Sequence, residues 1–221
     1  MKKALLLIFT VLSISVFGQF NCQSTKLNPL PLQSNAPINY NSRSDTADLV
    51  QLKLTIDSRN FANGQLKGIA EYQLGAKLPF SSLRFDLLGF TVDSIISLNG
   101  PLNFSQQGEH VIVNASAVAG QTLHWDFYYH GSTTKDASGW GGIHHDGAYN
   151  YNLGVGFAAN PHVYGRSLFP CFDNFVEKST LDEMNIITPS GKVGVSNGIY
   201  LGTDTLSSGD LVWRWEGQAP I

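Results

Sequence analysis

The sequence lacks the motifs that mark several large enzyme classes. None of its six histidines is followed by glutamate, so the His-Glu-x-x-His motif of zinc peptidases is absent. No serine lies between a strand pattern and a helical one, so the nucleophile turn of a serine hydrolase is not predicted. Gly154 and Gly156 have neither a third glycine nor a following helix, which argues against a dinucleotide-binding loop. We therefore expect no catalytic residue, no metal ligand and no cofactor in this chain.

Cysteine, charge and long apolar runs are also scarce. The only cysteines, Cys22 and Cys171, are too few for the disulfide framework of a small exported protein. One bridge between them stays open, but Cys22 lies in a polar stretch, and a buried, inert Cys171 fits the pattern better. The formal net charge of −3 gives no electrostatic reason to expect a nucleic acid or an anionic membrane as partner. Beyond the N-terminus, no apolar run is long enough for a transmembrane helix.

The N-terminus has the pattern of a secretory signal peptide. Lys2 and Lys3 precede an apolar run over residues 4–12, and small residues follow up to Gly18. We expect residues 1–18 to be cleaved near Gly18, with export to the periplasm or the exterior and no membrane attachment afterwards. A buried N-terminal strand or helix is the structural alternative. A lipoprotein would require acylation of Cys22, but the three residues before it are not small and apolar.

Residues 19–47 form a region of different composition. They are rich in asparagine, glutamine, serine and proline, a mixture that cannot bury much apolar surface. We expect a flexible polar leader over residues 19–47 and one β domain over residues 48–221. Order should begin near Asp48.

From Asp48 onward, apolar and polar residues alternate. Val50, Leu52 and Leu54 share one face of the first predicted strand, and no apolar spacing typical of a helix extends over three turns. Short strands separated by turn residues predict an all-β fold, either an antiparallel sandwich or a pair of curved sheets. The predicted strands cover residues 49–56, 66–74, 83–87, 92–98, 110–114, 122–129, 182–187, 192–195 and 211–215.

A long excursion over residues 131–166 interrupts the strands. It holds eight of the 22 glycines together with many aromatic residues, and such loops often carry binding surfaces. His144, His145 and His162 lie within it and could gather a metal ion. Adjacent histidines point in different directions, however, and this spacing is not that of the usual helical ligand pair. Solvated loop histidines are therefore the default expectation, and the role of the three stays open.

The four tryptophans allow two interpretations. Together they could form a platform on which a sugar stacks. Trp125 lies in an apolar strand register, and Trp213 and Trp215 share one face of the last predicted strand. Core packing is therefore the better interpretation for these three.

A run of motifs between Tyr164 and Gly198 resembles the N-terminal domain of the M1 family of zinc aminopeptidases, in an exported bacterial branch. That family has an Arg-x-x-Phe-Pro-Cys-Phe-Asp-Glu-Pro run, a Lys-Ala-Thr-Phe-type strand and a Val-Ser-Asn-Gly turn in this order. The resemblance spans residues 45–221. The matching residues are Arg166, Phe169, Pro170, Cys171, Phe172, Asp173, Lys178, Thr180, Val195, Ser196, Asn197 and Gly198.

The resemblance implies saddle-like β-sheets and a catalytic site that lies in a different domain. In the family, zinc is held by a His-Glu-x-x-His helix and a later glutamate, and these lie in the catalytic domain that follows. The implied partner is thus a catalytic domain of the same polypeptide, with peptide substrate met only indirectly and zinc present only in the parent enzyme. By this resemblance the chain is a fragment or truncated product, and alone it should not hydrolyse peptides.

Two departures from the family pattern affect the expected site. Asp173-Asn174-Phe175 replaces Asp-Glu-Pro. The family's Thr-Gln-x-Glu-type stretch, which helps to line the pocket for the first substrate residue, corresponds to Val155, Gly156 and Phe157. These three residues are the expected substrate-facing positions. None of them has a side-chain amide or carboxylate, so the family's recognition of the first substrate residue is not expected here.

The motif residues Arg166, Phe169, Pro170, Cys171 and Asp173 are interpreted as structural. We expect Arg166 and Asp173 to form a buried pair that fixes the loop around Pro170 and Cys171. The alternative for the whole chain is a free-standing secreted β-sandwich that binds a ligand without catalysis.

Overall fold

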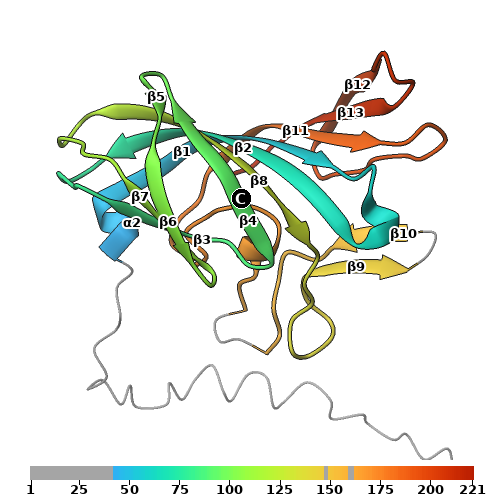
Figure 1. Cartoon of the computed structure of the whole chain (residues 1–221), viewed down its shortest axis with the longest axis horizontal. Coiled ribbons are helices and arrows are strands. Elements are labelled where there is room, and N and C mark those ends of the chain that lie inside the picture. Colours follow the sequence, from blue (N-terminus) through green and yellow to red (C-terminus); the bar gives the residue numbers. More distant parts are fainter. Residues whose placement is uncertain (1–41, 147–148, 159–161) are drawn as a thin grey trace, which may run out of the picture. The chain divides into compact units, whose positions relative to one another are not determined.

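The computed structural model describes residues 42–146, 149–158 and 162–221. The predicted signal peptide, Cys22 and nearly all of the predicted leader lie outside these residues. The described chain is mostly strand, in agreement with the predicted all-β class (Figure 1). The elements are α2 (Ser42–Thr46), β1 (Ala47–Asp57), η1 (Phe61–Asn63), β2 (Gln65–Ala76), β3 (Leu83–Asp86), β4 (Phe90–Ser97), β5 (Gly100–Pro101), β6 (Asn103–Gln107), β7 (His110–Asn114), β8 (Thr122–Ser132), β9 (Ile143–Asp146), β10 (Tyr149–Asn152), η2 (Gly165–Ser167), β11 (Thr180–Thr188), β12 (Ile199–Thr205) and β13 (Leu211–Glu216).

One large curved sheet forms the frame of the domain (Figure 1). Its eight strands run in the order β12-β13-β11-β1-β2-β8-β4-β5. In β2 buried and less buried residues alternate, as the period of two requires when one face is covered. In β1 the alternation is interrupted at Val50, which is 36% exposed beside a bulge in the pairing with β2. The expected place of Val50 on the same face as Leu52 and Leu54 is therefore wrong. All neighbours pair antiparallel except β1 and β11, which are parallel. The sheet therefore joins the first described strand to a strand near the C-terminal end.

A second sheet, in the order β3-β7-β6, contributes to the same apolar core. Phe85 of β3 is completely buried, and its ring centroid lies 4.7 Å from that of Phe127 in β8. Trp125 and Tyr72 complete this aromatic centre. The sandwich arrangement predicted from strand alternation is thus present, and Trp125 packs in the core as expected.

The predicted strand at residues 192–195 is wrong. These residues form part of the loop between β11 and β12, which covers the indoles of the last strand. The Trp215 indole N–H donates to the carbonyl of Gly194 at 3.2 Å. A Cβ at Gly194 would lie 2.9 Å from Ile186 side-chain atoms, so the backbone approaches β11 more closely than other residues allow.

The described structure begins earlier than the predicted start near Asp48. Residues 42–46 form the short helix α2, and β1 starts at Ala47. Ser44 is buried, and Arg43 forms an ion pair with Asp86 at 2.7 Å. These residues belong to the packed domain, because Arg43 has a partner of opposite charge and Ser44 accepts a hydrogen bond from Lys77 through its carbonyl. None of the described helices is long and apolar enough to cross a membrane.

Candidate functional site

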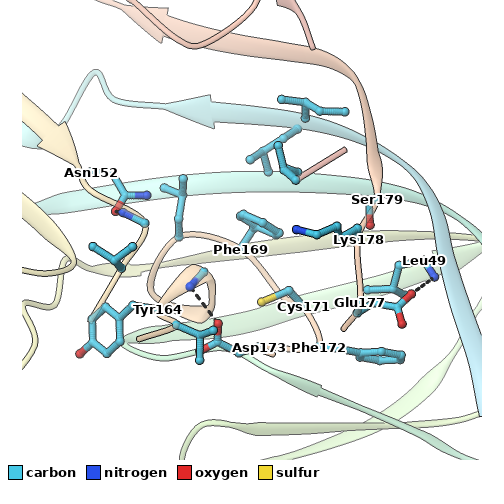
Figure 2. Close-up of a pocket in the computed structure, with 18 of the residues that line it drawn as sticks. Leu49, Asn152, Tyr164, Phe169, Cys171, Phe172, Asp173, Glu177, Lys178 and Ser179 are labelled. Atoms are coloured by element: carbon cyan, nitrogen blue, oxygen red, sulfur yellow. Dashed lines mark hydrogen bonds between the residues drawn. The ribbon is translucent and has the colours of Figure 1, made fainter. Parts of the chain in front are cut away.

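The described chain contains a cavity of about 370 Å³ (Figure 2). Leu54 of β1 and Met184 of β11 contribute to its lining, so the large sheet supplies part of the wall. The rest comes from residues 152–155, from the loop 196–197, and from residues 162–179. We call residues 164–179, which carry the Phe-Pro-Cys-Phe-Asp run, the motif loop.

The motif loop is held to both sheets by backbone and tyrosine hydrogen bonds. Cys171 exchanges two backbone hydrogen bonds with Asp86 of β3, at 2.8 and 3.0 Å. The Tyr72 hydroxyl donates to the carbonyl of Pro170 at 2.6 Å, and the Tyr129 hydroxyl donates to that of Leu168 at 2.8 Å. Burial raises the pKa of both tyrosines well above the usual value, so each hydroxyl remains a neutral donor. The position of the loop is therefore fixed by core residues.

Arg166 and Asp173 form the predicted ion pair inside the motif loop. The Asp173 carboxylate also accepts the backbone N–H of Gly165 at 2.9 Å, and Arg166 makes a second ion pair with Glu109 at 2.9 Å. Burial raises the pKa of Asp173, and the hydrogen bond from Arg166 opposes that rise. Each charge has partners inside the domain, an arrangement in keeping with a structural role.

Cys171 lies in the same loop as a buried thiol without a disulfide partner among the described residues. Burial raises its pKa well above the usual value, which keeps the thiol protonated and unreactive. The pairing of Cys171 with Cys22 falls outside the described residues. The expected burial of Cys171 is confirmed, and its lack of reactivity stays a prediction.

Sequence reasoning missed a second polar cluster beside the motif loop. The Arg43 guanidinium lies 5.1 Å from the ring centroid of Phe172, and it also pairs with Asp86. The buried Glu177 carboxylate accepts the backbone N–H of Leu49 at 2.6 Å, and burial raises its pKa. These residues occur singly in ordinary polar stretches, so no local pattern could have marked them.

The substrate-facing positions expected from the resemblance fall in three different surroundings. Val155 lines the cavity. Gly156 packs against the ring of Tyr164, where a Cβ would come within 2.9 Å of the ring. The Phe157 side chain is about half exposed, and its ring lies 5.7 Å from that of His162. Only Val155 of the three therefore borders the cavity.

One carboxylate organises the glycine-rich segment, which we define as residues 133–158. Asp136 accepts hydrogen bonds from the Ser138 hydroxyl, the Gly141 N–H and the Ala158 N–H, the last at 2.9 Å. Burial opposes the charged form, but these donors together hold the pKa of Asp136 well below its usual range. The Asp136 side chain thus holds a backbone N–H that lies 22 residues further along the sequence.

The histidines of the excursion do not converge. His144 is 7% exposed and stacks on Tyr151 with ring centroids 4.7 Å apart, so the expectation of a solvated residue is wrong for His144. His145 faces Asn150, whereas His162 lies near the carbonyl of Gly156. Among the residues that the structure describes, no three His, Cys, Asp or Glu side chains are placed to hold a metal ion. The described residues therefore do not fit zinc, and no metal-dependent step is assigned to them.

The sequence also contains one Gly-x-Ser-x-Gly match, at residues 194–198, which the sequence interpretation missed. Ser196 lies in the loop between β11 and β12, and strand β12 follows it. A nucleophile turn needs a strand before the serine and a helix after it. The match therefore carries no catalytic meaning here.

No family model and no curated protein matches the sequence. Among solved structures, a two-domain M1 zinc metallopeptidase variant bound to L-tryptophan aligns with a TM-score of 0.69 and 19% identity, covering 80% of this chain and 40% of that chain. The M1 zinc metallopeptidase from Deinococcus radiodurans gives 0.67, 17% and the same coverage. Aminopeptidase A from Legionella pneumophila, in complex with aspartic acid, gives 0.63 and 14%, covering 79% of this chain and 20% of that chain.

The chain has the fold of one part of an M1 zinc metallopeptidase. The predicted resemblance is thus confirmed at the level of fold. The chain spans about 40% of the length of the first two of these M1 structures and 20% of the Legionella pneumophila enzyme. Several of the residues that carry the resemblance in sequence also border the cavity, among them Phe169, Cys171 and Asp173.

Proposed function

We propose that this chain is the N-terminal β domain of an exported M1-like zinc metallo-aminopeptidase. The single observation that carries the proposal is the M1 fold, with a TM-score of 0.69, combined with the ordered motif run from Arg166 to Gly198. Fold likeness at 19% identity alone would leave function open. The motif run adds a second argument that is independent of the fold.

In this proposal the domain covers and helps to shape the substrate cleft of a catalytic domain that is not part of the 221 residues. Residues 1–18 serve as signal peptide, residues 19–47 as leader, and the β domain follows. Zinc and the activated water belong to the catalytic domain, because hydrolysis of this type needs both a metal and a general base. The role of the motif loop is to keep the wall of the cleft rigid through Arg166, Asp173 and the buried tyrosines.

The test is to read the gene beyond the codon for Ile221 and to assay its whole product. We expect the reading frame to encode a His-Glu-x-x-His domain, one zinc per molecule, and hydrolysis of aminoacyl arylamides that a chelator abolishes. The present 221 residues, assayed in parallel, serve as the control and should show no turnover. A stop codon directly after Ile221, with no zinc domain encoded nearby, would contradict the proposal.

A second function is favoured by one specific observation. Trp140 and Tyr149 are 71% and 73% exposed, which is unusual for large aromatic side chains and suits a free-standing binding module. Size-exclusion chromatography of the secreted chain, with a dye that reports exposed apolar surface, separates the two functions. A module should be monomeric with little dye binding, whereas a domain that lacks its catalytic partner should bind dye and self-associate.

A further inference from the structure

Lys178 places a positive charge at the cavity and has no ion-pair partner among the residues that the structure describes. Its side chain lines the cavity, and in Figure 2 the amine end points across it toward Phe169. Across the described ranges, no carboxylate or carbonyl oxygen forms an ion pair or hydrogen bond with Lys178. A cation in this position is available to an anionic ligand.

The negative charges that border the cavity have partners already. Asp173 is paired with Arg166 and accepts the Gly165 N–H. Glu177 accepts the Leu49 N–H. Among the side chains that line the cavity, the charge left to pair with a ligand is therefore the ammonium of Lys178.

Asn152 supplies a second polar contact on the other side of Phe169 in Figure 2. Its side-chain oxygen accepts the backbone N–H of Gly154 at 3.0 Å. That bond orients the amide, so the oxygen is used and the NH₂ group remains as a donor. A ligand that spans the cavity would meet an ammonium at one end and an amide donor at the other.

The surface between these two polar groups is largely apolar. Leu54, Leu181, Met184, Leu168 and Phe169 all line the cavity. A volume of about 370 Å³ falls within the range of pockets that bind small molecules. Apolar walls with a few directed polar groups are typical of sites that select both shape and charge.

We propose that this cavity binds a short apolar peptide through its free carboxylate. The ligand carboxylate pairs with Lys178, a ligand carbonyl accepts from the Asn152 amide, and apolar side chains pack on Phe169 and Met184. The site is formed entirely by described residues of this chain, so its binding can be tested on the chain as it stands.

The experiment is a titration of the full chain with N-acetyl-leucyl-leucine by calorimetry, followed by NMR. We expect a Kd on the order of 1 mM, because a ligand of this size gains little affinity per atom. The neutral C-terminal amide of the same peptide should bind roughly tenfold more weakly, the usual effect of losing a charge-assisted hydrogen bond. Decanoate, which has the charge but no internal carbonyl, tests for a fatty-acid site instead.

Variants assign the binding to the cavity. Lys178→Met keeps the aliphatic stem and should weaken binding of the free acid about tenfold while leaving the amide unchanged. Lys192→Met removes an exposed lysine from the loop after β11 and should change neither affinity. Absence of binding by the free acid, equal affinity of acid and amide, or an unchanged affinity in Lys178→Met would each overturn the proposal. Tighter binding of decanoate than of the peptide would overturn its peptide part.

Discussion

The motif loop and the glycine-rich segment both lie outside the strands of the large sheet, but they are held by different forces. The motif loop is tied to the core by buried tyrosine hydroxyls, by backbone pairing with β3, and by the ring of Phe172, which lies 5.1 Å from that of Phe85. In the glycine-rich segment, one carboxylate, Asp136, collects the hydrogen bonds that bring distant residues together.

This difference predicts two kinds of response to substitution. A change in the motif loop should lower the stability of the whole domain, because its contacts are contacts of the core. Within the glycine-rich segment Ile143 is buried in the core, but a change at its polar or exposed positions should open the segment locally and leave global unfolding almost unaffected. The five predictions below test this contrast, starting with the largest expected effect.

Replacing Phe85 with alanine should cost the most. Phe85 contacts four other aromatic rings, including Phe172 of the motif loop, and no neighbour can fill the space that its ring leaves. We expect the free energy of unfolding in urea to fall by about 3–5 kcal/mol. Leu98→Ala, at a side chain that is 82% exposed, is the control and should change it by less than about 0.5 kcal/mol. Equal effects of the two variants would show that the motif loop and the sheets do not share one core.

Asp173→Ala comes next. It removes the partner of Arg166 and the acceptor for the Gly165 N–H, so a charge and a donor lose their contacts. Glu109 still pairs with Arg166, and we therefore expect a loss of about 2–3 kcal/mol rather than the full cost of breaking a buried pair. Thermal unfolding measures this effect, and Arg166→Met in the same background tests the coupling. An unchanged melting temperature would contradict the structural interpretation of the pair.

These two regions also differ in how far the sequence predicts them. Alternation identified β1, β2 and β8, because most of each strand buries every second residue against one core. The motif loop was found through its resemblance to M1 peptidases, which supplied the pair of Arg166 and Asp173. In both cases a local pattern carried the information.

Other features depend on contacts between distant segments, for which a single sequence has no local signal. The parallel pairing of β1 with β11 joins Leu54 to Met184, and alternation does not reveal which strand lies beside which. The contact between Glu177 and Leu49 spans 128 positions. β12 was missed because its residues are mostly exposed at a sheet edge, so no alternation develops.

Asp136→Asn should act locally. The substitution keeps one acceptor oxygen but removes the charge that the Ser138, Gly141 and Ala158 donors stabilise. We expect faster amide hydrogen exchange and faster proteolysis within residues 137–158, with the melting temperature almost unchanged. A large drop in melting temperature would show that this segment belongs to the core after all.

Acid should have the same local effect in the unmodified chain. The pKa of Asp136 is lower in the folded state than in the unfolded state, so its carboxylate stabilises the segment above about pH 4. This stabilisation is lost as the pH falls through the folded-state pKa. We therefore expect hydrogen exchange at Gly141 and Ala158 of the unmodified chain, measured at decreasing pH, to show the same local opening that Asp136→Asn shows at neutral pH. If the exchange rates at these two positions depended on pH to the same extent in Asp136→Asn as in the unmodified chain, the opening could not be assigned to Asp136.

Trp140→Ser should have the smallest effect, although tryptophan is often costly to replace. The side chain is exposed, and the structural contacts of this residue are made by its backbone, which accepts from His144 at 3.0 Å and donates to Ser138 at 3.2 Å. Since serine keeps both backbone groups, we expect a change in the free energy of unfolding below about 0.5 kcal/mol by urea denaturation. Tyr151→Ser, which removes a ring stacked on His144, is the matched variant in the same segment and should be more destabilising. A loss above about 1 kcal/mol for Trp140→Ser would mean that this indole packs on the domain in solution, and the segment would then share the core's apolar stabilisation.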